Sequence, residues 1–400
     1  MTGWYFLELA NNKVQAYIHT YEDSDPARLA LTAKRDQHLP IQLIAAQIKS
    51  RQLAKRKLPE LYQKEGVIFP HGVPMEQCSS ELTAKYKATI VTGNSLTDLT
   101  GGFGIDAFYF SKVIENVVHV EQNAELSALV KHNSTLLELP IKCIYATAEE
   151  YLSSIEEKPA DTYYLDPARR DANDHRVFML QDCQPDLTSI LPEIHKRKAN
   201  CLIKVSPMLD IERALTTLPN VSEIHVVSVR NECKELLFLL DSKPRNNLTY
   251  HCVNIVNEYD REEFTISNTE ENTAVCKFGE VSTYLYEPNA SIMKASLFNS
   301  LAKRFDLVKL HRNSHLYTSD LFIEDFPGRA FRVIKKMALS KKSVRSEIPT
   351  LKANLTVRNY PMTVAQIRKQ IGLKEGGDDY IFATTLITGE ITGVLCEKIV

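Results

Sequence analysis

The sequence lacks the signatures of several common classes of protein. No apolar run approaches the roughly 20 residues that a helix needs to cross a bilayer, and no basic stretch near the start leads into an apolar one. The eight cysteines form no Cys-x-x-Cys pair, the eleven histidines form no His-Glu-x-x-His pattern, and no Gly-x-x-x-x-Gly-Lys-Ser/Thr loop is present. We therefore expect a cytoplasmic protein with reduced thiols, without a membrane anchor, a metal site or nucleotide hydrolysis. Single histidines inside expected strands, His119 and His225, are expected to be packed or hydrogen-bonded core residues.

Charge is nearly balanced over the whole chain but unevenly distributed along it. The formal net charge is −2, which argues against a chain that binds polyanions along its entire length. Residues 34–64 hold eight Lys and Arg against two acidic residues, and residues 294–345 hold twelve against four, whereas residues 258–271 are acidic. The basic stretches suit solvated helix faces, and they also point to nucleic acid as a partner.

The first 90 or so residues are predicted to be helical. Apolar residues at Ile41, Ile44, Ala45 and Ile48 follow the spacing of one helix face, and Pro59 ends that helix. Ser80 is a candidate N-cap for a second helix over residues 81–88.

From residue 95 on, short apolar strands alternate with helices, a pattern that predicts an α/β fold with a mostly parallel sheet. Seven strands are expected, at Ser95–Leu99, Val117–Glu121, Ile141–Tyr145, Thr162–Asp166, Cys201–Val205, Ile224–Val229 and Glu235–Leu240. Only residues 230–234 separate the last two strands, which is too short for a parallel crossover, so this pair is expected to be antiparallel.

The rest of the chain is predicted to be α+β, beyond a linker at residues 243–247. Residues 291–305 form a candidate amphipathic helix, and the turn at residues 376–379 precedes a β-rich segment over 380–394. The expected domains are a helical domain (1–92), a sheet domain (93–243) and two small α+β domains (248–318 and 319–400).

A glycine-rich turn follows the first expected strand, which ends at Asp98. The turn contains four residues that we assign to ligand binding: Thr100, Gly101, Gly102 and Gly104. Such a turn lets a ligand approach the backbone while the next helix presents its N-terminal amides, which suits a nucleotide. Ala107 also completes the weaker form of a dinucleotide fingerprint, so the glycines alone leave a nicotinamide cofactor open.

Two further segments end strands at the same edge of the expected sheet. Glu121 ends the second strand, where a carboxylate can accept both ribose hydroxyls of NAD or of S-adenosyl-L-methionine. Ala148 and Glu149 follow the third strand. This edge is therefore the predicted ligand site.

The fourth expected strand ends in Asp166-Pro167-Ala168-Arg169, across the point where ligands of open α/β sheets bind. A carboxylate at Asp166 and a rigidly held backbone carbonyl at Pro167 or Ala168 can hold an N–H group of a methyl acceptor. The alternative is a structural role, in which Asp166 caps a helix and Pro167 begins it. Arg169 and the next residue, Arg170, can grip a phosphate or pair with neighbouring acids.

These segments resemble the family of class I S-adenosyl-L-methionine-dependent methyltransferases that carry a ferredoxin-like and a C-terminal THUMP-like domain, a family associated with RNA modification. The resemblance is carried by residues 57–59, 76–81, 98–106, 166–170 and 204–207. It implies a Rossmann-like sheet of seven strands that ends in the antiparallel pair, with Ala148 and Glu149 beside the adenine. It also implies that Gln77, Ser79 and Asp106 lie in the cofactor site.

Departures from related enzymes narrow the expected chemistry. Enzymes that methylate adenine N6 or cytosine N4 usually carry an aromatic residue after Asp-Pro-Pro, whereas Ala168 and Arg169 stand here. Uracil-C5 enzymes need a nucleophilic cysteine where this chain has residues 206–208, Ser-Pro-Met, so we expect no cysteine in the crevice and no covalent catalysis. The glycine-rich turn is also similar to that of the small-subunit rRNA guanine-N2 methyltransferase, which favours a purine nitrogen as acceptor.

The sequence therefore predicts methylation of a base nitrogen in rRNA or tRNA by direct in-line transfer, with the basic regions holding phosphates. Two alternatives stay open. One is a methyltransferase that acts on a protein or a small molecule, and the other is a non-catalytic RNA-binding module on the same fold.

Overall fold

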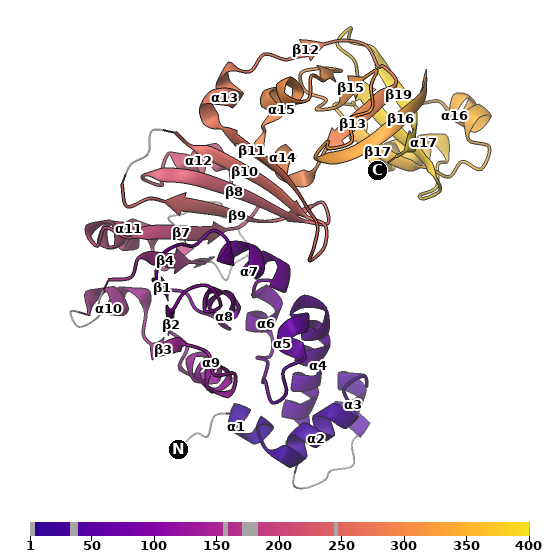
Figure 1. Cartoon of the computed structure of the whole chain (residues 1–400). Helices are drawn as coiled ribbons and strands as arrows, with labels where there is room; N and C mark the ends of the chain where they lie inside the picture. Colours follow the sequence, from indigo (N-terminus) through magenta and orange to yellow (C-terminus); the bar gives the residue numbers. More distant parts are fainter. Residues whose placement is uncertain (1–4, 33–38, 155–158, 170–182, 244–246, 400) are drawn as a thin grey trace. The chain divides into compact units, whose positions relative to one another are not determined.

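The computed structural model describes residues 5–32, 39–154, 159–169, 183–243 and 247–399 (Figure 1). The chain divides into two compact units, one of Met1–Ser222 with Leu236–Arg245 and the other of Glu223–Glu235 with Asn246–Val400. Among the described residues, no helix combines the length and the apolar character needed to cross a membrane.

Helices occupy the described residues before the first strand, as predicted. They are α1 (Tyr5–Leu9), α2 (Asn12–Thr20), α3 (Pro26–Thr32), α4 (Ile41–Lys57), α5 (Pro59–Tyr62), α6 (Val73–Gln77) and α7 (Glu81–Ala88). Ile44, Ala45 and Ile48 of α4 are buried. Pro59 begins α5, and the Ser80 hydroxyl accepts a hydrogen bond from the Thr83 amide at 3.3 Å, which confirms the predicted N-cap of α7.

The sheet of the first unit has the strand order β9-β7-β4-β1-β2-β3, in which β9 is antiparallel to β7 and the other pairs are parallel. Its strands are β1 (Ser95–Asp98), β2 (Asn116–Glu121), β3 (Ile141–Tyr145), β4 (Thr162–Leu165), β7 (Asn200–Val205) and β9 (Glu232–Leu240). Its helices are α8 (Ile105–Phe110), α9 (Ala124–Leu136), α10 (Ala148–Ser153), α11 (Leu187–Lys196) and α12 (Ile211–Leu215), and β5 (Ala168–Arg169) pairs with β6 (Cys183–Gln184). The order reverses at β1, between β2 and β4, which is where such sheets bind ligands.

The N-terminal helices and two helices of the sheet share one hydrophobic core. Phe6 of α1 and Ile48 of α4 belong to the same buried cluster as Phe108 of α8 and Leu129 of α9. Helix α8 follows the glycine-rich turn directly. By anchoring α8, this core also holds the end of the turn in place.

All seven predicted strands are present. β8 (Val221–Val229) and β9 form the predicted antiparallel hairpin, and their two-residue turn, Arg230 and Asn231, has φ of 51° and 63°. Two strands that the sequence did not reveal follow in the second unit: β10 (Thr249–Ile255), parallel to β8, and β11 (Arg261–Ser267), antiparallel to β10. Of the predicted linker at 243–247, residues 244–246 lie outside the described residues.

The second unit also contains an eight-stranded sheet with the order β12-β14-β15-β13-β16-β19-β18-β17. Its strands are β12 (Lys277–Phe278), β13 (Tyr284–Pro288), β14 (Val308–Lys309), β15 (Tyr317–Ser319), β16 (Gly328–Met337), β17 (Asn354–Arg358), β18 (Asp379–Thr385) and β19 (Ile391–Lys398). The helices of this unit are α13 (Asn268–Thr273), α14 (Ala290–Ala295), α15 (Phe298–Arg304), α16 (Lys341–Glu347) and α17 (Val364–Ile371).

The single helix predicted over residues 291–305 is wrong. The chain forms α14 and α15 instead, because Ser296 has a left-handed backbone (φ 59°) that ends α14. Apolar residues continue at helical spacing across this break, so the sequence pattern did not reveal it.

A buried carboxylate joins three strands of this second sheet. Glu287 of β13 is 2% exposed and accepts hydrogen bonds from Arg329 Nε of β16 at 2.9 Å and from Arg358 Nε of β17 at 3.0 Å. Each guanidinium is paired with one carboxylate oxygen, so the charge of Glu287 is fully compensated.

Removing the Glu287 charge should destabilise the second unit. We expect Glu287→Gln to lower the free energy of unfolding by about 2–3 kcal/mol, because two partly buried guanidinium groups lose their counter-charge. Lys277→Gln, which breaks the exposed ion pair with Asp306, should cost less than about 0.5 kcal/mol. Urea unfolding followed by circular dichroism compares the two variants, and equal costs would contradict this account.

Candidate active site

The ends of β1, β2 and β4 open into a pocket of about 280 Å³ in the first unit. All eleven residues predicted to contact the cofactor line it: Gln77, Ser79, Asp98, Thr100, Gly101, Gly102, Gly104, Asp106, Glu121, Ala148 and Glu149. Of the predicted catalytic residues, Asp166 and Ala168 line the same pocket, whereas Pro167 does not. The Arg169 side chain and Arg170 lie outside what the structure describes.

The glycine-rich turn is packed against a buried histidine of β2. A Cβ atom on Gly101 would lie 2.2 Å from His119 Nε2, so no larger residue fits there while the ring is in place. The same nitrogen lies 3.2 Å from the Gly102 carbonyl oxygen, and burial lowers the pKa of His119 to about 4. The ring is therefore neutral at physiological pH and can donate its Nε2 hydrogen to the turn.

Hydrogen bonds tie the turn to the acids at the strand ends. The Thr100 amide donates to Asp98 Oδ1 at 3.0 Å, and the Thr100 hydroxyl accepts from the Asp166 amide at 2.6 Å. The Gly102 amide donates to Glu121 Oε2 at 2.8 Å. The turn thus fixes the ends of β1, β2 and β4 relative to one another.

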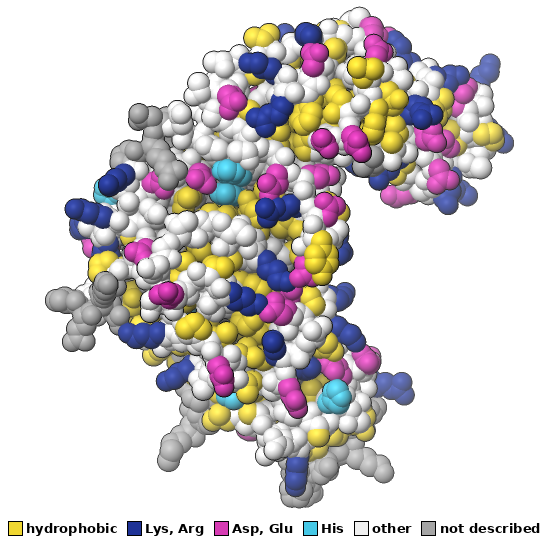
Figure 2. All heavy atoms as spheres, in the orientation of Figure 1, with side chains coloured by type: hydrophobic (Ala, Val, Ile, Leu, Met, Phe, Trp, Pro, Cys, Tyr) yellow, Lys and Arg dark blue, Asp and Glu magenta, His cyan; other side chains and the backbone are white. Residues whose placement is uncertain are grey.

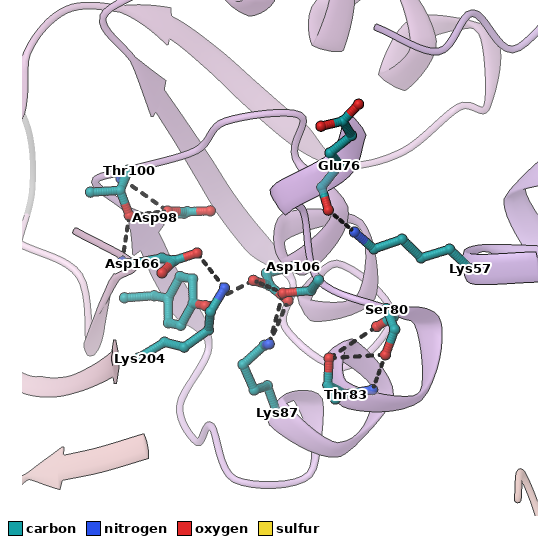
Figure 3. A network of polar contacts seen from close by, with 12 residues as sticks. Lys57, Glu76, Ser80, Thr83, Lys87, Asp98, Thr100, Asp106, Asp166 and Lys204 are labelled. Carbon is teal, nitrogen blue, oxygen red and sulfur yellow. Dashed lines mark hydrogen bonds and ion pairs between the residues drawn. The ribbon is translucent and has the colours of Figure 1, made fainter. Parts of the chain in front are cut away.

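Helix α6 reaches the pocket from the N-terminal region. The Lys57 ammonium at the end of α4 donates to the Glu76 carbonyl oxygen at 2.6 Å, which anchors the end of α6 where Gln77 lies (Figure 3). On the opposite wall, Thr147 caps α10 and orients Ala148 and Glu149.

Asp106 is the centre of a buried polar network (Figure 3). Its Oδ2 atom accepts from the Ser79 hydroxyl and from the Tyr164 hydroxyl, both at 2.8 Å. The fully buried Lys87 lies 3.1 Å from its Oδ1 atom and donates to Ser79 at 2.9 Å. Burial by itself raises the pKa of Asp106, but Lys87, Lys204 and the two hydrogen bonds outweigh it and lower the pKa below its ordinary value.

Lys204 at the end of β7 forms an ion pair with Asp166, and its ammonium points between the Asp166 and Asp106 carboxylates (Figure 3). Neither Lys87 nor Lys204 is among the predicted site residues. A lysine inside the apolar run Cys201–Val205 is a signal that could have identified Lys204, whereas Lys87 has no comparable mark in its helix.

The described charged residues that line the pocket are all acidic: Asp98, Asp106, Glu121, Glu149 and Asp166. Burial raises the pKa of Asp98 well above its usual range, and three neighbouring carboxylates raise it further, against the hydrogen bond from the Thr100 amide. A cationic ligand would favour the ionised carboxylates, whereas a phosphate would be repelled.

The prediction that no cysteine occupies the crevice is wrong, because Cys78 lines the pocket from the N-terminal side. The alignment with uracil-C5 enzymes considers only the segment after β7, and Cys78 comes from the end of α6. Burial raises the pKa of the Cys78 thiol, and its Sγ atom donates to the Met75 carbonyl oxygen at 3.3 Å. The thiol is thus protonated and poorly suited to nucleophilic attack.

Comparison with known proteins matches two segments to domain families. Residues 284–327 match a ferredoxin-like domain family, and residues 328–398 match a family described as THUMP domain-like. No curated protein matches the chain in sequence.

Solved structures include one similar over nearly the whole chain. A methyltransferase candidate from Porphyromonas gingivalis W83 is 29% identical, with a TM-score of 0.86 over 96% of this chain and 97% of that one. A class I S-adenosylmethionine-dependent methyltransferase candidate from Listeria monocytogenes is 11% identical, with a TM-score of 0.36 over 64% and 90% of the two chains. A Pyrococcus abyssi tRNA (uracil-54, C5)-methyltransferase in complex with S-adenosyl-L-homocysteine is 16% identical, with a TM-score of 0.29 over 40% and 37%.

The chain therefore combines a methyltransferase-type α/β sheet with a ferredoxin-like and a THUMP-like domain. Its architecture is that of the P. gingivalis protein over almost the full length of both chains. The predicted ferredoxin-like and THUMP-like domains and the predicted fold class are confirmed, while the division of the chain into four domains, with its bounds, stays a prediction.

The contact between Gly101 and His119 can be tested by a double-mutant cycle. Gly101→Ala should destabilise the protein by about 1–3 kcal/mol, because the new methyl group overlaps the ring. In the background of His119→Ala the same substitution should cost at least about 1 kcal/mol less. Urea unfolding of the four proteins gives the coupling free energy.

Gly102→Ala is the matched control. Its Cβ would meet no atom closer than 3.8 Å, although φ is +52°, so its cost should be backbone strain that His119→Ala does not relieve. If Gly101→Ala also lowers the free energy of unfolding by the same amount in the wild type and in His119→Ala, the His119 ring does not hold the turn.

Proposed function

We propose that the protein is an S-adenosyl-L-methionine-dependent methyltransferase. Its substrate would be a base nitrogen of an RNA, either rRNA or tRNA, which it would methylate by direct in-line transfer. One observation carries the proposal. The residues that sequence motifs assign to the cofactor and the acid assigned to the acceptor line a single pocket at the point where the strand order reverses.

The charge of the pocket favours S-adenosyl-L-methionine over a dinucleotide. The sulfonium and ammonium groups of S-adenosyl-L-methionine are cationic, and the described charged residues that line the pocket are acids. The pyrophosphate of NAD would bring two negative charges beside Asp98 and Glu121. The glycine pattern leaves both cofactors open, and the electrostatic argument supports S-adenosyl-L-methionine.

The turn and Glu121 offer groups that a cofactor of this kind would use. Both oxygens of Glu121 are oriented by backbone amides, from Gly102 at 2.8 Å and from Asn123 at 2.7 Å, and each keeps a lone pair for a ribose hydroxyl. Gly102 has no atom within 3.4 Å of the position of a Cβ, so a ligand can approach its backbone. The cofactor would supply an electrophilic methyl group on its sulfonium.

Asp166 is the residue that we assign to the methyl acceptor. Its amide is held by the Thr100 hydroxyl, and Lys204 pairs with its Oδ2 atom. The second carboxylate oxygen can accept a hydrogen bond from an N–H group of the base, which orients the nitrogen for attack. No covalent intermediate is required, in agreement with the protonated Cys78.

The second unit supports RNA as the substrate. THUMP-type domains help deliver RNA in other enzymes, and residues 328–398 match a THUMP domain-like family. Nine of the twelve basic residues within 294–345 are exposed: Lys303, Arg304, Arg312, Arg332, Lys335, Lys336, Lys341, Lys342 and Arg345. Figure 2 shows basic side chains interspersed with acidic ones on the face in view, so contacts to phosphates would be distributed over the surface.

Cofactor binding is the first test. Calorimetry should detect one S-adenosyl-L-methionine per chain and no heat with NAD. Glu121→Gln should weaken the affinity by about 10- to 100-fold, because a hydrogen bond to a charged group contributes about 1.5–3 kcal/mol. Glu115→Gln removes an exposed acid outside the pocket and should leave the affinity unchanged.

The pH dependence gives a second readout of the same experiment. Because the pKa of Asp98 is raised, the affinity for the cationic cofactor should increase as rising pH ionises this carboxyl. Asp98→Asn should bind weakly and lack this increase. Tighter binding of NAD than of S-adenosyl-L-methionine would contradict the assignment.

Transfer is tested with RNA from cells that lack the gene, labelled cofactor and purified protein. Asp166→Asn should reduce turnover by about 100-fold, because the acceptor loses a positioned charge. Lys204→Met should reduce turnover less, by about 10-fold, because Asp166 is still present but has lost its ion pair with Lys204. Lys196→Met removes an exposed lysine paired with Glu193 and is the control. Label in protein instead of RNA would favour the alternative acceptor.

A further inference from the structure

Two strands of the second unit bring two histidines and a glutamate together. Glu223 and His225 lie two residues apart on β8, so their side chains share one face of the sheet. His251 of β10 is the register partner of His225, and the two imidazole rings are stacked with centroids 4.4 Å apart. None of the three residues lines the pocket of the first unit.

The three side chains converge on one point. The Nε2 atoms of His225 and His251 lie 3.2 Å and 3.4 Å from the same oxygen, Glu223 Oε2. One potential ligand atom from each residue lies within 4.8 Å of the others, a grouping that is compatible with a shared metal ion.

The distances match metal coordination better than they match strong hydrogen bonds. Charge-assisted N–H···O bonds are usually about 2.7–2.9 Å long, shorter than both contacts. Zinc–ligand bonds of about 2.0–2.2 Å place two ligands of a tetrahedral ion about 3.3–3.6 Å apart, and those of an octahedral ion about 2.8–3.1 Å apart. The observed 3.4 Å lies in the tetrahedral range, and the observed 3.2 Å lies just below it.

A neighbouring hydroxyl group orients one of the two histidines. His251 Nδ1 lies 3.1 Å from the Thr265 hydroxyl of β11, a contact of the kind that orients metal-binding imidazoles and leaves Nε2 for the ion. The His225 side chain is 6% exposed, whereas those of Glu223 and His251 are 25% and 27% exposed. His225 is thus buried, whereas solvent can reach Glu223 and His251.

We propose that Glu223, His225 and His251 form a zinc site, with two imidazole nitrogens and one carboxylate oxygen as ligands and a fourth position open to water. Three protein ligands with a fourth position for water or substrate are typical of zinc sites that are not purely structural. The ion would also link β8 to β10, in addition to the backbone hydrogen bonds of this parallel pair. This proposal does not depend on the methyltransferase function.

Zinc binding is measured on the untagged full-length protein, because a polyhistidine tag itself binds zinc. Competition with a chromogenic chelator, with elemental mass spectrometry of the isolated complex, should find one zinc ion per chain. His251→Asn should weaken the affinity by at least about 100-fold, since losing even an outer-shell partner costs about 10- to 100-fold. His19→Asn removes a histidine whose side chain is 87% exposed and outside the cluster, and it should bind zinc as the wild type does.

Two further readouts separate loss of a ligand from loss of the fold. Zinc should raise the melting temperature of the wild type but not of Glu223→Gln, whose circular dichroism spectrum should be unchanged. Thr265→Val keeps all three ligands and should weaken zinc binding by about 10-fold or more. The absence of saturable binding to the wild type, or equal affinity in wild type and His251→Asn, would overturn the proposal.

Discussion

The ring of His119 lies against the glycine-rich turn of the first unit, and the positions of the turn and of the acids bonded to it depend on this contact. Gly101 is close enough to the ring that a methyl group would overlap it, and the ring nitrogen is within hydrogen-bonding distance of the Gly102 carbonyl oxygen. With the turn fixed there, the Gly102 amide orients Glu121, and Thr100 joins Asp98 to Asp166. A buried neutral imidazole therefore determines the geometry at the ends of three strands.

Several carboxylates lie close together in and around this pocket, so negative charge is concentrated there. Asp98 is buried beside other carboxylates, which raises its pKa, while Asp106 keeps its charge because Lys87 and Lys204 lie near it. Lys87 pairs with Asp106 and Lys204 with Asp166, and neither lysine lines the pocket. The pocket thus retains an acidic lining suited to a cationic ligand, while the charge of Asp106 is compensated by the ion pair with Lys87.

Local patterns predicted much of this structure. The spacing of Ile44, Ala45 and Ile48, the cap at Ser80 and the apolar strand segments are properties of short stretches, so α4, α7 and all seven strands were predicted nearly in place. Many residues that line the pocket were also predicted, those at strand ends because their motifs share one edge of a parallel sheet, and Gln77, Ser79 and Asp106 through the family resemblance. Their roles in binding and catalysis stay predictions.

Features that depend on tertiary contacts could not be predicted in this way. Cys78 reaches the pocket, and Lys87 reaches the network around Asp106, only through the packing of α6 and α7, and neither lies in a motif tied to the sheet. The break at Ser296 depends on one left-handed residue inside a continuous apolar pattern. His225 and His251 are 26 positions apart and meet only because β10 pairs with β8 in parallel, so each looks like an isolated core histidine in the sequence.

The central claim is that this pocket methylates RNA, and nucleoside analysis of cells tests it most directly. Stable RNA from cells with and without the gene would be digested and compared by mass spectrometry, with complementation by the wild type or by Asp166→Asn. We predict that one methylated nucleoside disappears without the gene, returns with the wild type and stays absent with Asp166→Asn. Identical nucleoside profiles in all four strains would contradict the account.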